Sequence, residues 1–166
     1  MVIIGVDPAF RKGGFWACFL DTDDRTVVFR QFRDVLAWDR FLRSEDAPES
    51  AYAVIENSNL QNITFARHMT GDRAAIIRKS RNVGTNQAAS ELTVQSAIDR
   101  YGKDAVLNLS PEKKGAKYDE RYFFAALKGD RVTPIGYTGT QDERDAYKLA
   151  HIGLSELKMR WRVLVR

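Results

Sequence analysis

The stretch VIIGVDPAFRKGGFWACFLD, residues 2–21, carries one carboxylate, Asp7, at the end of its first apolar run. Residues 2–7 are short, rich in β-branched side chains and bounded by Pro8, which predicts a buried strand. A charge in an apolar strand is strongly unfavourable unless another group compensates it. Asp7 therefore predicts a compensating group that the fold brings to it from elsewhere in the chain.

Two further apolar runs follow the first strand and predict an antiparallel meander. The runs at 15–20 and 26–32 are separated by the sequence DTDD, residues 21–24, whose aspartates support a tight turn. The first three strands are therefore expected to lie next to one another in chain order.

The remainder of the chain alternates between strands and helices. Apolar runs at 52–55 and 105–109 predict a fourth and a fifth strand, and the fourth leads directly into Glu56. Helices are predicted at 34–43 with Asp34 as N-cap, at 86–101, at 118–128 and at 142–158. Such alternation implies parallel crossovers. The predicted fold class is α/β, one domain over residues 1–166, with a five-stranded mixed sheet flanked by helices.

Composition restricts the class of protein. The chain has 166 residues, which suits one domain, and its single cysteine, Cys18, excludes an intramolecular disulfide and a CxxC metal site. Cys18 is predicted to be a small buried side chain. No apolar run approaches the ~18 residues of a membrane span, and no secretory signal is visible. The expected location is cytoplasmic, with no membrane partner.

Positive charge is concentrated in one segment. The net charge is +4, and residues 67–81 alone carry an equal surplus. Their basic residues are Arg67, Arg73, Arg78, Lys79 and Arg81. Basic clusters near aromatic side chains suit a polyanion such as nucleic acid, although a solvated face is the simpler alternative for any one cluster. Residues 57–85 show no clear period and are predicted to be a functional loop.

Four carboxylates occupy positions that suit a shared site. Asp7 and Glu56 end predicted strands, and Asp142 and Asp145 lie three residues apart on one face of the last helix. Two simpler interpretations stay open: Glu56 as a solvent-facing strand end, and Asp142 as the helix N-cap.

Carboxylates that converge repel one another, and a divalent cation removes the conflict. Ligation by oxygen alone suits Mg²⁺ or Mn²⁺ rather than zinc. Two such ions ~3.5–4 Å apart can activate a water and stabilise the leaving oxygen of a phosphodiester. The acidic residues and the basic surface together predict a metal-dependent nuclease.

The sequence resembles the RuvC-like Holliday junction resolvases of the RNase H-like superfamily. The similar segments are GVDPAF (5–10), AVIENSNLQN (53–62), NVGTNQAASEL (82–92) and DERDAYKLA (142–150), in the family's order. The segment KKGAKYDERYFF (113–124) is closer to phage-type members. The resemblance implies an RNase H-like fold, a homodimer, a role in DNA recombination and repair, and Mg²⁺-dependent cleavage of four-way DNA junctions, with two ions per site and Mn²⁺ as a substitute.

The resemblance also implies roles for single residues. Asp7, Glu56, Asp142 and Asp145 would bind the metal, with Asp145 the firmer of the last pair. A lysine of 113–117 would contact the scissile phosphate, and Lys117 is the favoured one. The implied DNA contacts are the basic residues of 67–81 together with Leu60, Phe65, Lys113, Lys114 and Lys117. The helix at 86–101 would form the dimer interface.

The chain departs from the family pattern in two places. The positions after the glutamate where the family often has a base-stacking aromatic are Asn59 and Leu60 here, so the base contact falls to either Leu60 or Phe65. Phe10 and Arg11 stand where small residues are frequent.

Other functions fit parts of the same pattern. A related nuclease on this fold would cut flaps, other branched DNA or RNA–DNA hybrids. A non-catalytic DNA-binding module would use its carboxylates structurally. A nucleotide-dependent phosphotransferase is disfavoured, because the chain is too short for two lobes and lacks glycine-rich phosphate loops.

Overall fold

The computed structural model describes residues 1–8, 13–60 and 73–164. Its strands form one sheet in the order β5-β4-β1-β2-β3-β6. The strands are β1 (Val2–Val6), β2 (Phe15–Asp21), β3 (Thr26–Phe32), β4 (Ala51–Glu56), β5 (Val106–Leu109) and β6 (Thr133–Ile135). The helices are α1 (Val35–Leu42), α2 (Arg73–Tyr101), α3 (Pro111–Lys114), α4 (Glu120–Asp130) and α5 (Gln141–Leu164), with single 3₁₀ turns η1 (Ser58–Leu60) and η3 (Lys103–Ala105).

The predicted α/β class and mixed sheet are confirmed. Strands β1, β2 and β3 form the antiparallel meander, and β4 and β5 add in parallel on the other side of β1. The predicted count of five strands is wrong, because β6 pairs in parallel with β3. β6 has only three residues, and Pro134 at its centre argues against a strand in the sequence.

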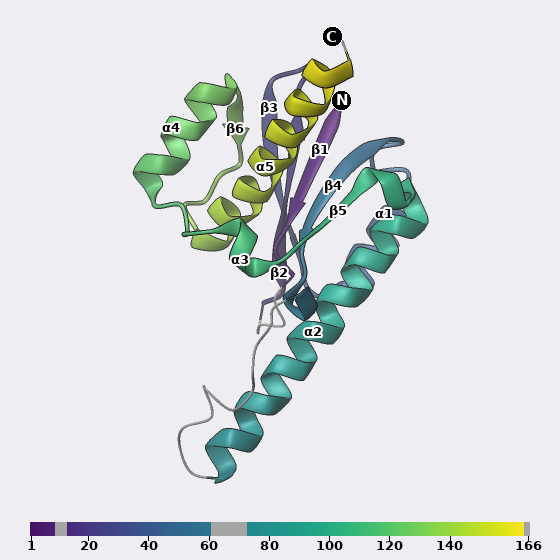
Figure 1. The fold of residues 1–166 in the computed structure, drawn as a ribbon, viewed down its shortest axis with the longest axis vertical. Helices are drawn as coiled ribbons and strands as arrows, with labels where there is room; N and C mark the ends of the chain where they lie inside the picture. Colours follow the sequence, from purple (N-terminus) through teal and green to yellow (C-terminus); the bar gives the residue numbers. More distant parts are fainter. Residues whose placement is uncertain (9–12, 61–72, 165–166) are drawn as a thin grey trace.

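Helices cover both faces of the sheet (Figure 1). Ile3, Val54 and other residues of one face pack against α4 and α5, and the core there includes Cys18, as predicted. The opposite face packs against α1 and the later part of α2 around Trp38, whose indole donates to the carbonyl of Thr93 on α2. None of the described helices is long and apolar enough to cross a membrane.

Helix α2 begins earlier than predicted. It starts at Arg73 rather than near residue 86, so much of the predicted loop is helical. Figure 1 shows the first part of α2 extending away from the sheet. The first of its described side chains to be buried is Ala89. A helical segment that does not cover a core has no apolar periodicity, which is the signal that sequence patterns depend on.

Gly5 determines how closely α5 approaches β1. A Cβ atom at Gly5 would lie 2.1 Å from the carbonyl oxygen of Ala146 and 2.5 Å from the amide nitrogen of Ala150. Only glycine allows this contact between a strand and a helix backbone. Asp7 follows β1 two residues after Gly5, and Asp145 immediately precedes Ala146, so both acids lie next to this close contact in the chain.

Candidate active site

Asp7 and Glu56 follow directly from the register of two parallel strands. The last paired residues of β1 and β4 are Val6 and Ile55, so Asp7 and Glu56 are adjacent at the same end of the sheet. Side chains alternate between the faces of a strand, so both acids share the face that α5 covers. The group that compensates the charge of Asp7 must therefore reach the face of the sheet that α5 covers.

The start of α5 is fixed by a capping box that does not involve Asp142. Glu143 accepts hydrogen bonds from the amides of Thr138 and Thr140 at 3.0 and 2.9 Å, and its own amide donates to Thr140 Oγ1 at 3.2 Å. Thr140 is thus the N-cap, and the interpretation of Asp142 as the N-cap is wrong. Asp142 lies in the first helical turn, three residues before Asp145.

Asp145 is the most deeply buried of the four predicted carboxylates, with 1% of its side chain exposed. Gln141 donates to its Oδ1 at 2.9 Å. Lys117 Nζ lies 3.6 Å from its Oδ2, but 64% of the Lys117 side chain is exposed. Lys117 therefore lies at the outer side of the site.

The cation between the strand carboxylates is Lys114. Its Nζ atom donates a hydrogen bond to Asp7 Oδ2 at 2.6 Å and lies 2.7 Å from Glu56 Oε2. Only 7% of the Lys114 side chain is exposed. Lysine is rarely buried to this extent unless it is paired. Of the lysines at 113–117, Lys114 and not the favoured Lys117 lies within the carboxylate pair.

Burial and the neighbouring charges shift the pKa values of both Glu56 and Lys114. Burial and the nearby Asp7 raise the pKa of Glu56 despite Lys114, and Asp145 raises it further. Burial lowers the pKa of Lys114, but Asp7 and Glu56 outweigh burial, so that its pKa is raised. The two carboxylates thus stabilise a positive charge bound between them.

The donor set fits a hard divalent cation. Glu56 Oε2 is buried and has no partner in hydrogen-bond geometry, although Lys114 Nζ is close. A metal ion does not need directional hydrogens, and carboxylate oxygens are the ligands that Mg²⁺ and Mn²⁺ prefer. Within residues 1–8, 13–60 and 73–164, no three acidic, histidine or cysteine side chains form a ready metal-binding group. Lys114 pairs with both strand carboxylates and lies between them.

A second buried lysine, Lys148, was missed by sequence reasoning. Its ammonium group donates to the carbonyl of Ala116 and lies 4.9 Å from the centre of the Tyr118 ring. Burial and the nearby Lys114 lower the pKa of Lys148. Lys148 lies one turn after Asp145 on the same side of α5. This spacing in the sequence could have identified Lys148 as a residue near the site.

The predicted DNA contacts are distributed over several elements. Arg73 and Arg81 are exposed on the first part of α2, and Lys113 is exposed on α3. Leu60 ends η1, four residues after Glu56, with 47% of its side chain exposed.

Several predicted residues lie outside the described part of the structure. They are Phe10, Arg11, Phe65 and Arg67, together with the side chains of Arg78 and Lys79.

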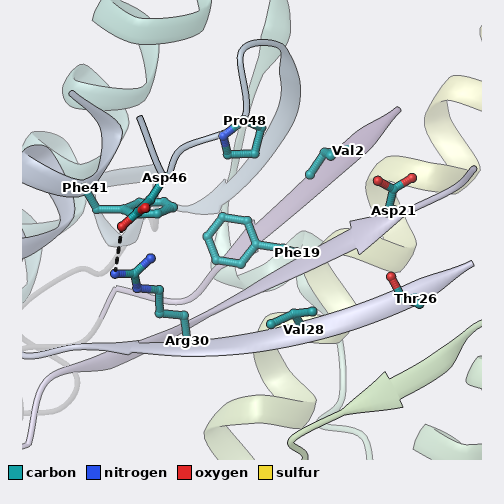
Figure 2. Close-up of a pocket in the computed structure, with 9 residues that line it drawn as sticks. All are labelled: Val2, Phe19, Asp21, Thr26, Val28, Arg30, Phe41, Asp46 and Pro48. Carbon is teal, nitrogen blue, oxygen red and sulfur yellow. Dashed lines mark ion pairs between the residues drawn. The ribbon is translucent and has the colours of Figure 1, made fainter. Parts of the chain in front are cut away.

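A hollow on the α1 side of β1, β2 and β3 is separate from the carboxylates (Figure 2). Val2, at the start of β1, lines it together with Phe19. Arg30 lies 4.3 Å from the centre of the Phe41 ring and 3.9 Å from Asp46. The hollow lies on the face of the sheet that α1 covers, whereas Asp7 and Glu56 lie on the face that α5 covers, so the hollow takes no part in the site.

No family model matches the sequence, and no curated protein gives a significant match.

Proposed function

We propose that this protein is a structure-selective endodeoxyribonuclease that cleaves four-way DNA junctions with the help of divalent metal ions. The observation that carries the proposal is the pair of carboxylates, Asp7 and Glu56, at one end of adjacent strands, with Asp145 near enough to Glu56 to raise its pKa. The meander followed by parallel strands is the arrangement that the RNase H-like resemblance implies. The proposal therefore includes the assignment of this chain to the RNase H-like fold class.

The metal would be held by carboxylates that different elements supply. Asp7 directly follows β1, Glu56 ends β4 and Asp145 lies on α5, and Asp142 in the first turn of α5 would complete the set. Mg²⁺ or Mn²⁺ at this place, as one ion or as the pair of ions that the resemblance implies, would polarise the phosphodiester and lower the pKa of a water. The rigid sheet and the close packing at Gly5 hold the ligands in position.

The lysines would act on the phosphate. Lys117 is exposed beside Asp145 and is placed to meet a DNA strand that approaches the carboxylates. A positive charge there would stabilise the negative charge that develops on the phosphate during cleavage. Gln141 would keep Asp145 oriented through the hydrogen bond to Oδ1.

The basic surface would bind the arms of the junction. α2 has 29 residues and spans roughly 43 Å at ~1.5 Å per residue, and Arg73 and Arg81 are exposed on its first part. Contacts of this kind bind phosphates without reading sequence, which suits an enzyme that recognises the shape of its substrate. Leu60 would contact bases near the branch point.

The decisive experiment is cleavage of a defined four-way junction with Mg²⁺, alongside a flap, an RNA–DNA hybrid and a linear duplex. We expect paired incisions on the junction and little cutting of the duplex. The Asp7→Asn variant should lose cleavage by at least roughly 10³-fold, because a ligand is removed, and should keep its affinity for the junction. Strong cutting of the hybrid alone would reject the proposal in favour of a related nuclease.

One observation favours a second candidate, a non-catalytic DNA-binding module. The ion pairs of Lys114 with Asp7 and Glu56 form a cluster that is compatible with a purely structural role. The same assay separates the two candidates. A module of this kind would bind the junction without cutting it, with or without the Asp7→Asn change.

A further inference from the structure

Lys114 lies where a cation shared by Asp7 and Glu56 would have to lie. Its Nζ atom is 2.6 Å from one carboxylate oxygen and 2.7 Å from the other, inside the protein. An ammonium group and a divalent ion in this place would repel each other strongly, because little water separates them. The two cations therefore exclude one another.

We propose that Lys114 is an exchangeable counter-ion of the carboxylate pair, and that a divalent metal ion binds there only when the Lys114 ammonium group leaves. The inference rests on the proposed function, because it assumes that these carboxylates bind metal. Lys114 thereby protects the metal-free protein from repulsion between Asp7 and Glu56 and weakens its affinity for metal.

The backbone on both sides of Lys114 is anchored, so the exchange is a movement of the side chain. The amide of Lys114 donates to the carbonyl of Ser110 at 3.3 Å within the single turn of α3. After Gly115, the carbonyl of Ala116 accepts a hydrogen bond from the ammonium group of Lys148. The carbonyl of Tyr118 accepts hydrogen bonds from Gln141 at 3.1 Å and from Arg144 at 3.3 Å. The flexible side chain of lysine can turn while these contacts persist.

After the exchange, the displaced Lys114 ammonium group is available to contact the substrate. A lysine that leaves the carboxylates remains tethered beside them, within reach of a phosphate bound at the metal. Metal binding would therefore release a second positive group next to Lys117 at the time when the substrate needs it.

The first test is Mn²⁺ binding without DNA, measured by titration calorimetry on the full chain. Lys114→Met removes the ammonium group and keeps a long side chain, and we expect it to tighten Mn²⁺ binding by at least about tenfold. Lys103→Met removes an equal charge from the exposed turn η3, outside the site, and should change the affinity less than about threefold. An equal gain in Lys103→Met would overturn the inference, since it would reflect only net charge.

A second measurement uses the wild-type protein, in case Lys114→Met does not fold. Lysine labelled with ¹³C at Cε is followed by NMR during Mg²⁺ titration, and the Lys114 signal is assigned by its loss in Lys114→Arg. We expect this signal to shift as the metal binds. Calorimetric binding of Mg²⁺ with an unchanged Lys114 signal would contradict the exchange.

The outcomes distinguish the inference from the proposed function. If the wild type cleaves junctions and Lys114→Met binds Mn²⁺ no more tightly, the exchange is wrong and the nuclease proposal stands. If neither protein binds Mn²⁺ and the wild type does not cleave, both are wrong.

Discussion

Lys148 uses its charge to hold backbone rather than to pair with a carboxylate. It is almost fully buried on α5, and its ammonium group is bound to the carbonyl of Ala116 and packed on Tyr118. The segment that it holds begins immediately after Lys114 and contains Lys117. A single lysine on the last helix thus orients the lysines that face the carboxylates.

We predict that Lys148→Met lowers the rate of junction cleavage by roughly 10–100-fold, because the segment loses its anchor. The affinity for the junction should change less than about twofold, since Lys148 is buried. Single-turnover kinetics and a binding isotherm measure the two effects. Lys128→Met, on the exposed side of α4, is the matched control and should leave both unchanged.

At the level of residues, the sequence indicates the acids better than the lysines. Asp7 and Glu56 stand out because each ends an apolar run, and Asp145 because it lies three residues after Asp142 on one helix face. Three lysines within five residues at 113–117 look alike in the sequence. The one-turn helix α3 and Gly115, with a φ of 71°, direct Lys114 inward and carry the chain on to Lys117 outside. That difference depends on a turn too short to predict.

At the level of elements, a second buried carboxylate links α4 to α5 away from the active site. Asp130, at the end of α4, accepts hydrogen bonds from Tyr147 at 2.7 Å and from His151 at 2.6 Å. Burial raises the pKa of Asp130, but the hydrogen bonds from His151 and Tyr147 outweigh burial and hold its pKa below the usual 3.8. This contact fixes the end of α4 to the middle of α5.

We predict that Asp130→Asn lowers the free energy of unfolding by about 2 kcal/mol near pH 7. Because the folded-state pKa is depressed, the stabilisation by Asp130 is fully present above the unfolded value of 3.8 and is lost as the pH falls through the folded value. Urea unfolding at pH 7 and in steps down to pH 3 measures both. Asp104→Asn, at an exposed position in η3, should show neither effect. A difference that does not change with pH would contradict this account.

Elements with a buried face were predictable, and elements without one were not. The strands of the meander and α5 alternate or repeat apolar residues against a core. The predicted strands and the predicted start of α5 agree closely with the structure, whereas α5 ends at Leu164 rather than at 158. The first part of α2 packs on no core side chain that the structure describes, so its sequence carries no period. β6 is joined to the sheet by backbone hydrogen bonds, which leave no pattern in side chains.

At the level of the whole molecule, an apolar groove between α1 and α2 offers a surface for a second copy. It is lined by Leu36, Ala88 and Leu92 among others, and Leu92 has 58% of its side chain exposed. A junction has two strands to cut, so the proposed function needs two active sites. A twofold dimer supplies them with matched geometry.

We predict that the protein is a dimer and that Leu92→Glu converts it to a monomer, because a charge in the interface would be desolvated. Sedimentation velocity at several concentrations measures the change. Ile135→Glu, an exposed position on β6 outside the groove, should remain dimeric. A monomeric wild type, or a dimeric Leu92→Glu protein, would contradict the predicted interface.

The short strand β6 has a consequence for how the sheet behaves toward other molecules. The amide of Thr133 donates to the carbonyl of Arg25, on the side of β6 that faces β3. Backbone groups of successive residues point to opposite sides of a strand, so the backbone nitrogen of Pro134 points toward the open edge of the sheet. Proline has no amide hydrogen, so this edge presents no donor at its central position. A strand from another molecule could not form a complete set of backbone hydrogen bonds with β6. Intermolecular strand pairing is therefore disfavoured at this edge of the sheet. The sequence feature that hid β6 from prediction thus protects the protein from ordered aggregation.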